Sequence, residues 1–509
     1  MYRPLKKIVS VMAAGAIAFS SLSMLSLTAA ADDGFDDLDQ QAFTAAMGVG
    51  WNLGNTLEAT NGKGIVSETA WGNPKASEEL LKLVKQSGFS SVRMPVSWLS
   101  NIGDGPNYTV NKTWLKRVHE VVDYCINNDL YVIVNMHGDG YYSIDGGWLL
   151  CGEDDSKQKE IKAKYESAWR QIAEEFKDVD EHLIFESMNE EFDGTYGNPT
   201  YTGYKNINEY NQIFVDTIRK TGGNNTKRWL LVPGWNTDID QTVNRYNTEI
   251  DGEKVEYGFD VPTDEYCEAE TSRIAVSVHY YNPWDFCGSD TNKLKTQWGP
   301  DAQKLRSPSY GTPADMHNLI TKLYDNFTSK GHPVIIGEFG ANDRSAYDRN
   351  NTEFRRYWCA SLVTEAKKAG CIPVYWDNGW TGANGFALFN RKDNTVFQQS
   401  IIDGMVEAMN SEDENYTVPS VTFKELPLGD VNMDGQVTSA DAMKIIAYAK
   451  KVLVFDEKNK VADAEVKILC DINEDAVIDT KDAMLAVGAA KKTITITKTN
   501  KSVYGNGTL

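Results

Sequence analysis

Two glutamates stand where a paired acid and base could act. Glu190 follows Asn189 in the segment IFESMNEEF, and Glu338 ends the apolar run VIIGEFG. A carboxyl that donates a proton, placed beside a carboxylate that stays ionised, is the arrangement that cleaves a glycosidic bond. The residues alone leave a structural alternative open, in which Glu338 is the buried ion-pair partner of Arg93.

Polar side chains able to support such a pair occur at similar positions in the chain. Arg93 and Tyr281 can hydrogen-bond an ionised carboxylate and stabilise its charge. His137 and His279 can bind sugar hydroxyls or orient an acid, and Asn189 can contact a sugar 2-hydroxyl. A lone histidine is usually a satisfied core residue, so a structural role for either histidine stays open.

Tryptophans gather near the same loops. Sugar rings present C–H faces that stack on aromatic planes, so a row of tryptophans suits an extended saccharide cleft. Each one alone is more often a core residue than a ligand platform, and Trp376 is the strongest candidate. The set comprises Trp51, Trp98, Trp148, Trp235, Trp284, Trp376 and Trp380.

The elements that must position these residues repeat along most of the chain. Between residue 47 and about residue 410, short β-rich apolar segments alternate with stretches of helical periodicity, which predicts a parallel sheet wound with helices. The expected strands are 48–51, 91–94, 131–135, 183–186, 229–232, 274–278, 334–336 and 373–376. Eight such units predict a (β/α)8 TIM barrel, in which reactive residues meet at the C-terminal ends of the strands.

Several of these segments together resemble glycoside hydrolase family 5, the cellulase family A. They are the strand-end His137 and the motifs GWNLGNTLEA, VRMPVSW, SMNEE, VHYYNPWDF, IGEFG and VYWDNG, in the family's order over roughly residues 35 to 410. The resemblance implies a secreted endo-β-1,4-glucanase that retains anomeric configuration and needs no metal for hydrolysis. It implies that Glu190 is the general acid/base and Glu338 the nucleophile, with carboxyls about 5 to 5.5 Å apart. Arg93, His137, Asn189, His279, Tyr281 and Trp376 match the remaining family positions.

Two other functions remain open. The same family includes xyloglucanases, lichenases, mannanases and xylanases, and the shape of the cleft loops distinguishes them. A noncatalytic carbohydrate-binding component of a scaffold would need a cleft but no acid/base pair, so the intact Glu190 and Glu338 speak against it.

An acidic loop repeats near the C-terminus. DVNMDGQVTSAD (430–441) and DINEDAVIDTKD (471–482) each precede a short apolar segment with helical periodicity. Their oxygen donors have the spacing of an EF-hand calcium loop, which predicts two Ca2+ sites. The ligands of the first site are Asp430, Asn432, Asp434, the Gln436 carbonyl, Thr438 and Asp441, and those of the second are Asp471, Asn473, Asp475, the Val477 carbonyl, Asp479 and Asp482.

Both loops end in Asp, and this duplicated loop-helix unit resembles a type I dockerin. The resemblance implies a small all-α domain that binds a cohesin on the scaffolding protein of a cellulosome in a Ca2+-dependent manner. Gly435 stands at the sharp turn of the first loop, whereas Ala476 takes that position in the second and is expected to strain it. Residues Ser439, Ala440, Thr480 and Lys481 fall where the family selects its cohesin.

Composition and the two ends of the sequence predict the cellular location and the domain boundaries. The net charge of -21 disfavours a nucleic-acid partner. A basic start, an apolar run and an Ala-Ala-Ala site predict a secretory signal peptide over residues 1–31, with no membrane segment after its cleavage. Seven scattered cysteines exclude a full disulfide framework. We expect the catalytic barrel over 32–410, a linker over 411–425, the dockerin over 426–492 and a Lys- and Thr-rich tail over 493–509.

Overall fold

Eight parallel strands close into a barrel in this protein. The computed structural model describes residues 35–499 except 293, 305, 349, 423–424 and 454–465, so the expected signal peptide lies outside the described residues. The barrel strands pair in the order β1-β10-β9-β8-β5-β4-β3-β2. This arrangement confirms the predicted TIM barrel. The strands are β1 (Gly50–Asn52), β2 (Ser91–Met94), β3 (Tyr131–Asn135), β4 (Leu183–Glu186), β5 (Leu230–Asp238), β8 (Ile274–Tyr280), β9 (Val334–Phe339) and β10 (Cys371–Tyr375).

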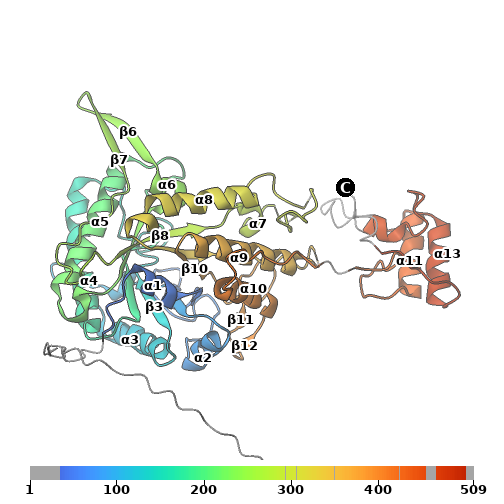
Figure 1. The fold of residues 1–509 in the computed structure, drawn as a ribbon, viewed down its shortest axis with the longest axis horizontal. Helices are drawn as coiled ribbons and strands as arrows, with labels where there is room; N and C mark the ends of the chain where they lie inside the picture. Colours follow the sequence, from blue (N-terminus) through green and yellow to red (C-terminus); the bar gives the residue numbers. More distant parts are fainter. Residues whose placement is uncertain are drawn as a thin grey trace, which may run out of the picture. The chain divides into compact units, whose positions relative to one another are not determined.

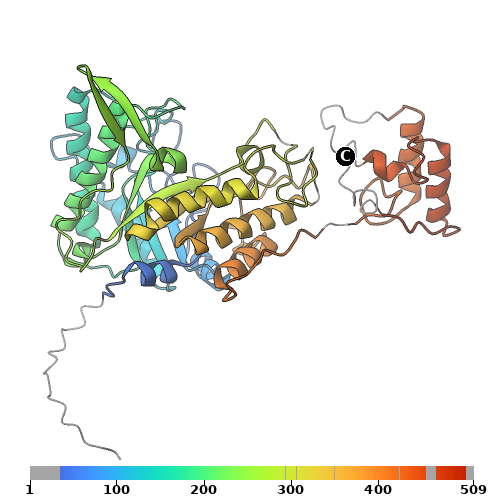
Figure 2. The same cartoon turned by 45° about the horizontal axis from the view of Figure 1, so that its top comes forward.

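Helices surround the strands on the outside (Figures 1 and 2). Most begin at a side chain that satisfies free backbone N–H groups. Ser77 caps α2, and Thr312 and Asp315 form a capping box at α8. The helices that follow barrel strands are α2 (Glu78–Gln86), α3 (Lys112–Ile126), α4 (Asp155–Phe176), α5 (Tyr201–Lys220), α8 (Pro313–Asn326), α9 (Asn351–Lys368) and α10 (Gln399–Asn410).

Insertions lie between β5 and β8 and after β10. The first contains α6 (Ile239–Val243) and a hairpin of β6 (Arg245–Ile250) and β7 (Glu253–Gly258), which projects from the barrel body in Figure 1. Short helix α7 (Trp284–Cys287) follows β8, and the small pair β11 (Phe389–Asn390) and β12 (Thr395–Val396) follows β10. These longer connections supply additional walls around the barrel mouth.

The barrel interior is apolar at its N-terminal end. Helix α1 (Gln40–Met47) comes directly before β1, and its Phe43 and Met47 are fully buried against interior residues such as Ile133 and Leu231. Phe43 also stacks on Trp229 with ring centroids 4.6 Å apart. Because α1 closes this end, polar groups inside the barrel gather at the C-terminal ends of the strands.

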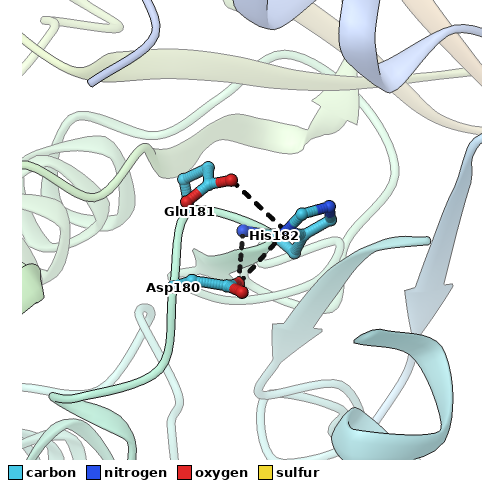
Figure 3. Close-up of side chains that lie close together, drawn as sticks. All are labelled: Asp180, Glu181 and His182. Carbon is cyan, nitrogen blue, oxygen red and sulfur yellow. Dashed lines mark hydrogen bonds and ion pairs between the residues drawn. The ribbon is translucent and has the colours of Figure 1, made fainter. Parts of the chain in front are cut away.

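A charged cluster marks the N-terminal side of β4 (Figure 3). The His182 Nδ1 atom lies 3.1 Å from the Asp180 carboxylate and 3.4 Å from the Glu181 carboxylate, and its ring stacks on Tyr131. The hydrogen bond with Asp180 raises the pKa of His182 above its ordinary value. All three charged residues precede β4, whereas Glu190 follows it, so this cluster lies at the opposite end of the strand from the predicted site.

The C-terminal repeats form a separate small core. Helices α11 (Ser439–Ala449) and α13 (Thr480–Ala490) follow the two acidic loops, and residues 466–470 are also helical. Leu428, Ile445 and Leu469 are fully buried in this core. Part of the expected tail belongs to it as well, since Ile496 packs against the core and Leu428 N–H donates to the Lys498 carbonyl.

The segment expected as a linker is partly packed. Arg356 donates to the carbonyls of Pro419 and Ser420, and Val421 joins the core of the barrel. Among the described residues, no helix is both long and apolar enough to cross a bilayer.

Candidate active site

The predicted polar residues meet at the C-terminal end of the barrel. A cleft of about 910 Å³ opens there. Six of them line this cleft: His137, Glu190, His279, Tyr281, Glu338 and Trp376. Arg93 and Asn189 lie below its surface and are 0% and 1% exposed. The structure thus brings the two glutamates and the six residues predicted to support them into one constellation.

Glu338 is held by a permanent cation and a hydroxyl. Arg93 Nη1 donates to Glu338 Oε1 at 2.9 Å, and the Tyr281 hydroxyl donates to Glu338 Oε2 at 3.0 Å. Both contacts favour the ionised carboxylate. The predicted ion pair between Arg93 and Glu338 is therefore present, but it lies at the floor of a cleft.

Glu190 faces Glu338 from the other side of the cleft. His279 Nδ1 lies 2.9 Å from Glu190 Oε1, and the Tyr141 hydroxyl donates to Glu190 Oε2 at 3.2 Å. Asn189 is fixed between the two sides, since it accepts from Arg93 Nη2 and donates to the Tyr141 hydroxyl, both at 2.6 Å. Glu190 itself has φ +45°, a left-handed conformation that costs energy in a residue with a side chain.

The two carboxyls are close enough to act on one bond. Glu190, His279 and Glu338 each offer an atom, and these atoms all lie within 4.8 Å of one another. Inverting glycosidases need about 6.5–9.5 Å between carboxyls to admit a water, whereas retaining ones use about 5–5.5 Å. An oxygen–oxygen approach within 4.8 Å is closer to the spacing of retaining enzymes than to that of inverting ones.

Burial and neighbouring charges shift the pKa values of the two carboxyls. Burial raises the pKa of Glu338, although the charges of His279 and Arg93 oppose the rise. Burial also acts to raise the pKa of Glu190, but the hydrogen bond and charge of His279 outweigh it, so that pKa is lowered. The lowering at Glu190 requires a protonated His279, while Arg93 is always charged. His279 Nδ1 lies 2.9 Å from Glu190 Oε1 and 3.7 Å from Glu338 Oε2, and Arg93 lowers the pKa of both carboxyls, so the two groups act on both members of the pair.

His137 and Trp376 form a stacked wall of the cleft. Their ring centroids are 6.0 Å apart and their planes differ by 6°. Burial, followed by the charge of Arg93, holds the pKa of His137 well below its ordinary value, so the imidazole is neutral. A neutral imidazole can both donate to and accept from a sugar hydroxyl.

Other polar residues complete the floor of the site and were not predicted. Glu186 accepts from Arg93 Nε at 2.7 Å, from Ser277 Oγ at 2.7 Å and from Asn135 Nδ2 at 2.9 Å. Asn52 accepts from Arg93 Nη1 at 3.1 Å. Asn52, Asn135 and Glu186 each end a buried strand, and a polar residue at such a position was the available sequence signal.

The predicted row of tryptophans is only partly correct. Trp376 and Trp284 line the cleft, and Trp284 is 55% exposed. Trp51, Trp98 and Trp235 are buried core residues, so their assignment to a saccharide platform is wrong. Trp51 lies in β1, Trp235 in β5 and Trp98 in the loop after β2, and all three rings belong to the core of the barrel. Tyr196 and Tyr310, which the sequence did not single out, provide exposed rings in the cleft instead.

The remaining two predicted tryptophans lie outside the cleft lining. Trp148 is half-buried beneath the ammonium group of Lys164, which lies 4.2 Å from the ring centroid. Trp380 is 61% exposed in the loop after β10.

The two acidic loops of the C-terminal domain adopt matching conformations. In the first, Asp430 accepts from the N–H groups of Asp434 and Gly435. In the second, Asp471 accepts from those of Asp475 and Ala476. The repeat thus extends from sequence to hydrogen bonding.

The donors of both loops fit a hard cation. Each loop ends in a buried aspartate, Asp441 or Asp482, at the start of the following helix, and the donor set consists of carboxylate, amide, hydroxyl and carbonyl oxygens. Ala476 has φ +64°, the strained turn that its side chain predicted, whereas Gly435 has φ +90° without a side chain.

Comparisons with known proteins identify both domains. Residues 54–382 match Cellulase (glycosyl hydrolase family 5), and residues 428–487 match the Dockerin type I domain. Endoglucanase A of Paenibacillus barcinonensis is 49% identical over 395 residues, which cover 77% of this chain and 92% of that protein. Endoglucanase B of Clostridium cellulovorans is 33% identical, over 82% of this chain and 84% of that protein.

A solved structure agrees with these relatives. The family 5 xyloglucanase from Paenibacillus pabuli matches with a TM-score of 0.68 and 50% identity, covering 72% of this chain and all of that one. The barrel, the constellation at its mouth and these matches lead to one assignment. The chain belongs to glycosyl hydrolase family 5 and carries a type I dockerin domain after its barrel.

Proposed function

We propose that the barrel is a retaining endo-β-1,4-glucanase in which Glu338 is the nucleophile and Glu190 the general acid/base. The observation that carries this proposal is the pair of carboxyls within 4.8 Å at the barrel mouth, with Arg93 on one and His279 on the other. The names of the relatives support the substrate class, since two of them are endoglucanases.

The first step forms a glycosyl-enzyme. A Glu338 oxygen attacks the anomeric carbon while the bond from that carbon to the bridging oxygen breaks. Glu190 gives its proton to that oxygen, so the leaving saccharide departs with a hydroxyl group. Tyr281 and Arg93 hold Glu338 in the orientation for attack, because they occupy its two oxygens at 3.0 and 2.9 Å.

The second step releases the sugar. Glu190, now ionised, takes a proton from water, and the water oxygen attacks the same anomeric carbon. The ester bond to Glu338 breaks and its electron pair returns to the carboxylate, which Arg93 stabilises. Glu190 has regained its proton, so the site returns to its starting state with the anomeric configuration retained.

Xyloglucan is the second candidate substrate. The solved xyloglucanase is 50% identical to this chain, and exposed rings of Trp284, Tyr196 and Tyr310 line the cleft. Exposed rings at a cleft rim can stack on a decorated backbone as well as on a plain one.

The C-terminal domain serves attachment in this proposal. Asp430, Asn432, Asp434, Gln436, Thr438 and Asp441 would hold one Ca2+, and Asp471, Asn473, Asp475, Val477, Asp479 and Asp482 a second. Bound calcium would neutralise the acidic loops and fix helices α11 and α13 for a cohesin. Export through a signal peptide at 1–31 would place the enzyme outside the cell, docked in a cellulosome.

The packing described above suggests where the domains end. We place the boundary of the barrel after residue 421, because Val421 is part of its core. The dockerin then extends from residue 426 to at least residue 499, where Thr499 pairs with Pro427.

Release of reducing sugar tests this function. The mature protein is assayed on carboxymethyl cellulose, xyloglucan, mixed-linkage β-glucan, mannan and xylan, with Glu338→Gln as the control. We expect cleavage of glucan or xyloglucan that the variant loses. Activity only on mannan or xylan would keep the mechanism and overturn the substrate, and binding without release of reducing ends would favour a noncatalytic carbohydrate-binding protein.

A further inference from the structure

Glu191, directly after the proposed acid/base, has a buried carboxyl that the mechanism does not use. Glu190 lines the cleft, whereas Glu191 is 0% exposed and turns into the protein. Burial raises the pKa of Glu191 well above its ordinary value, and the nearby charge of Asp139 adds to the rise. Burying a carboxyl costs free energy, so its presence beside Glu190 indicates a structural or functional role.

The carboxyl of Glu191 contacts the loop between β3 and α4. Its Oε1 atom accepts from the Cys151 N–H at 3.0 Å. Its Oε2 atom has no hydrogen-bond partner within the part of the chain that the structure describes, and it lies against Gly140, where a Cβ would come within 1.8 Å of it. One carboxyl thus contacts two separate points of the loop, Gly140 and Cys151.

Gly140 is followed by Tyr141, the residue that donates to Glu190. The loop over residues 136–154 has no regular helix or strand, so packing and side-chain contacts must determine its position. The dipeptide Glu190-Glu191 therefore holds this loop twice, through the Tyr141 hydroxyl in the cleft and through Gly140 and Cys151 behind it.

The backbone at this point is strained as well. Glu190 has φ +45°, and the carbonyl of Glu191 accepts from the N–H of Asn236, whose own φ is +51°. Such conformations persist only where surrounding contacts fix them.

We propose that Glu191 is a positioning residue for the acid/base, which fixes Glu190 and Tyr141 relative to each other by clamping the 136–154 loop behind the cleft. This inference deepens the proposed function and depends on it. It predicts a defect mainly in proton transfer, because the loop contacts Glu190 directly through Tyr141 but reaches Arg93 only through Asn189.

A comparison of substrates with different leaving groups distinguishes a positioning role from a general loss of structure. We compare kcat/KM for 2,4-dinitrophenyl β-cellobioside with kcat/KM for a cello-oligosaccharide. Dinitrophenolate departs without a proton, and kcat/KM reports the glycosylation step, so only the oligosaccharide requires the acid. For Glu191→Ala we expect a loss of about 10- to 100-fold on the oligosaccharide and a change of less than about threefold on the aryl glycoside.

Two further variants make the test specific. Glu191→Gln keeps the shape and the acceptor for Cys151, so it should recover most of the activity that alanine loses. Gly140→Ala should reproduce the selective loss, because its Cβ takes the space of Glu191 Oε2. In the Glu191→Ala background that space is free, so Gly140→Ala should then cost much less, a non-additivity expected of residues in contact.

Phe43→Ala is the matched control, since it removes a fully buried side chain at the other end of the barrel. It should leave the ratio of the two kcat/KM values unchanged. Equal losses on both substrates in Glu191→Ala, or glutamine performing no better than alanine, would overturn the positioning role. A wild type that hydrolyses neither substrate would overturn the proposed function itself, and the inference with it.

Discussion

Arg93 is the charge on which the floor of the site depends, and replacing it with leucine should destabilise the barrel in a pH-dependent way. The guanidinium is 0% exposed and donates to Glu186, Asn52, Glu338 and Asn189. Arg93→Leu leaves the carboxylates of Glu186 and Glu338 buried without their cation. Breaking a buried ion pair typically costs about 3–5 kcal/mol of unfolding free energy, and we expect a loss of this size at pH 7.

The pH dependence follows from the sign of the linkage. Arg93 lowers the pKa of Glu338, so its removal raises that folded-state pKa further above the unfolded value of about 4.3. The loss of unfolding free energy in Arg93→Leu is therefore small below the unfolded-state pKa of Glu338. It grows as the pH rises through the folded-state pKa. One proton taken up over two pH units changes the free energy by at most about 2.7 kcal/mol, so the loss at pH 5 should be smaller than at pH 7 by about 1–2.5 kcal/mol.

Urea unfolding followed by tryptophan fluorescence measures this loss. All 13 tryptophans lie between residues 51 and 380, so the signal reports on the barrel alone. Arg228→Leu is the matched control, because Arg228 is also 0% exposed but donates to the main-chain carbonyls of Phe176, Val179, Asp180 and Leu183. The unfolding free energy lost in Arg228→Leu should not differ between pH 5 and pH 7. A loss below about 1 kcal/mol in Arg93→Leu, or equal losses at the two pH values, would refute the reasoning.

Further predictions concern the two domains. His279→Gln removes the group that lowers the pKa of Glu190, so the basic limb of the kcat/KM profile should move to higher pH; an unmoved limb would contradict this. His182→Gln should lower the melting temperature at pH 6 but hardly at pH 8, because a raised histidine pKa stabilises the fold only while the ring is protonated. Trp376→Ala should raise KM or lower kcat on glucan at least about tenfold without altering the melting temperature by more than a few degrees. Ala476→Gly should tighten Ca2+ binding at the proposed second site several-fold in calorimetry, as relief of about 1 kcal/mol of strain implies, and chelation by EGTA should abolish the proposed cohesin binding.

Much of the barrel is predictable because the apolar runs are short and clearly bounded. Strands β2, β3 and β4 occupy the predicted residues, and β10 begins two residues before the predicted start. Strand β5 runs to Asp238, well past its apolar part, because its polar end pairs with His279 of β8. Apolar periodicity cannot show an extension that tertiary pairing produces.

The proposed catalytic pair and its contacts Arg93, His279 and Tyr281 were predictable from strand ends, but Glu186 and Tyr141 were not. Glu186 and Tyr141 act through partners far away in sequence, and only the closed barrel brings Glu186 to Arg93. The burial of Trp51 and Trp98 has the same cause, since a ring near a strand end can point into the wall or into the cleft. Spacing along the chain does not distinguish these directions.

Trapping the glycosyl-enzyme tests the central claim most directly. The protein is incubated with 2,4-dinitrophenyl 2-deoxy-2-fluoro-β-cellobioside, whose fluorine slows both steps while its good leaving group speeds the first, so that the glycosyl-enzyme accumulates. Intact mass should rise by one fluorocellobiosyl group, and peptide mapping should place that group on Glu338. Label on another residue, or hydrolysis with no covalent adduct and inverted product, would contradict the retaining mechanism.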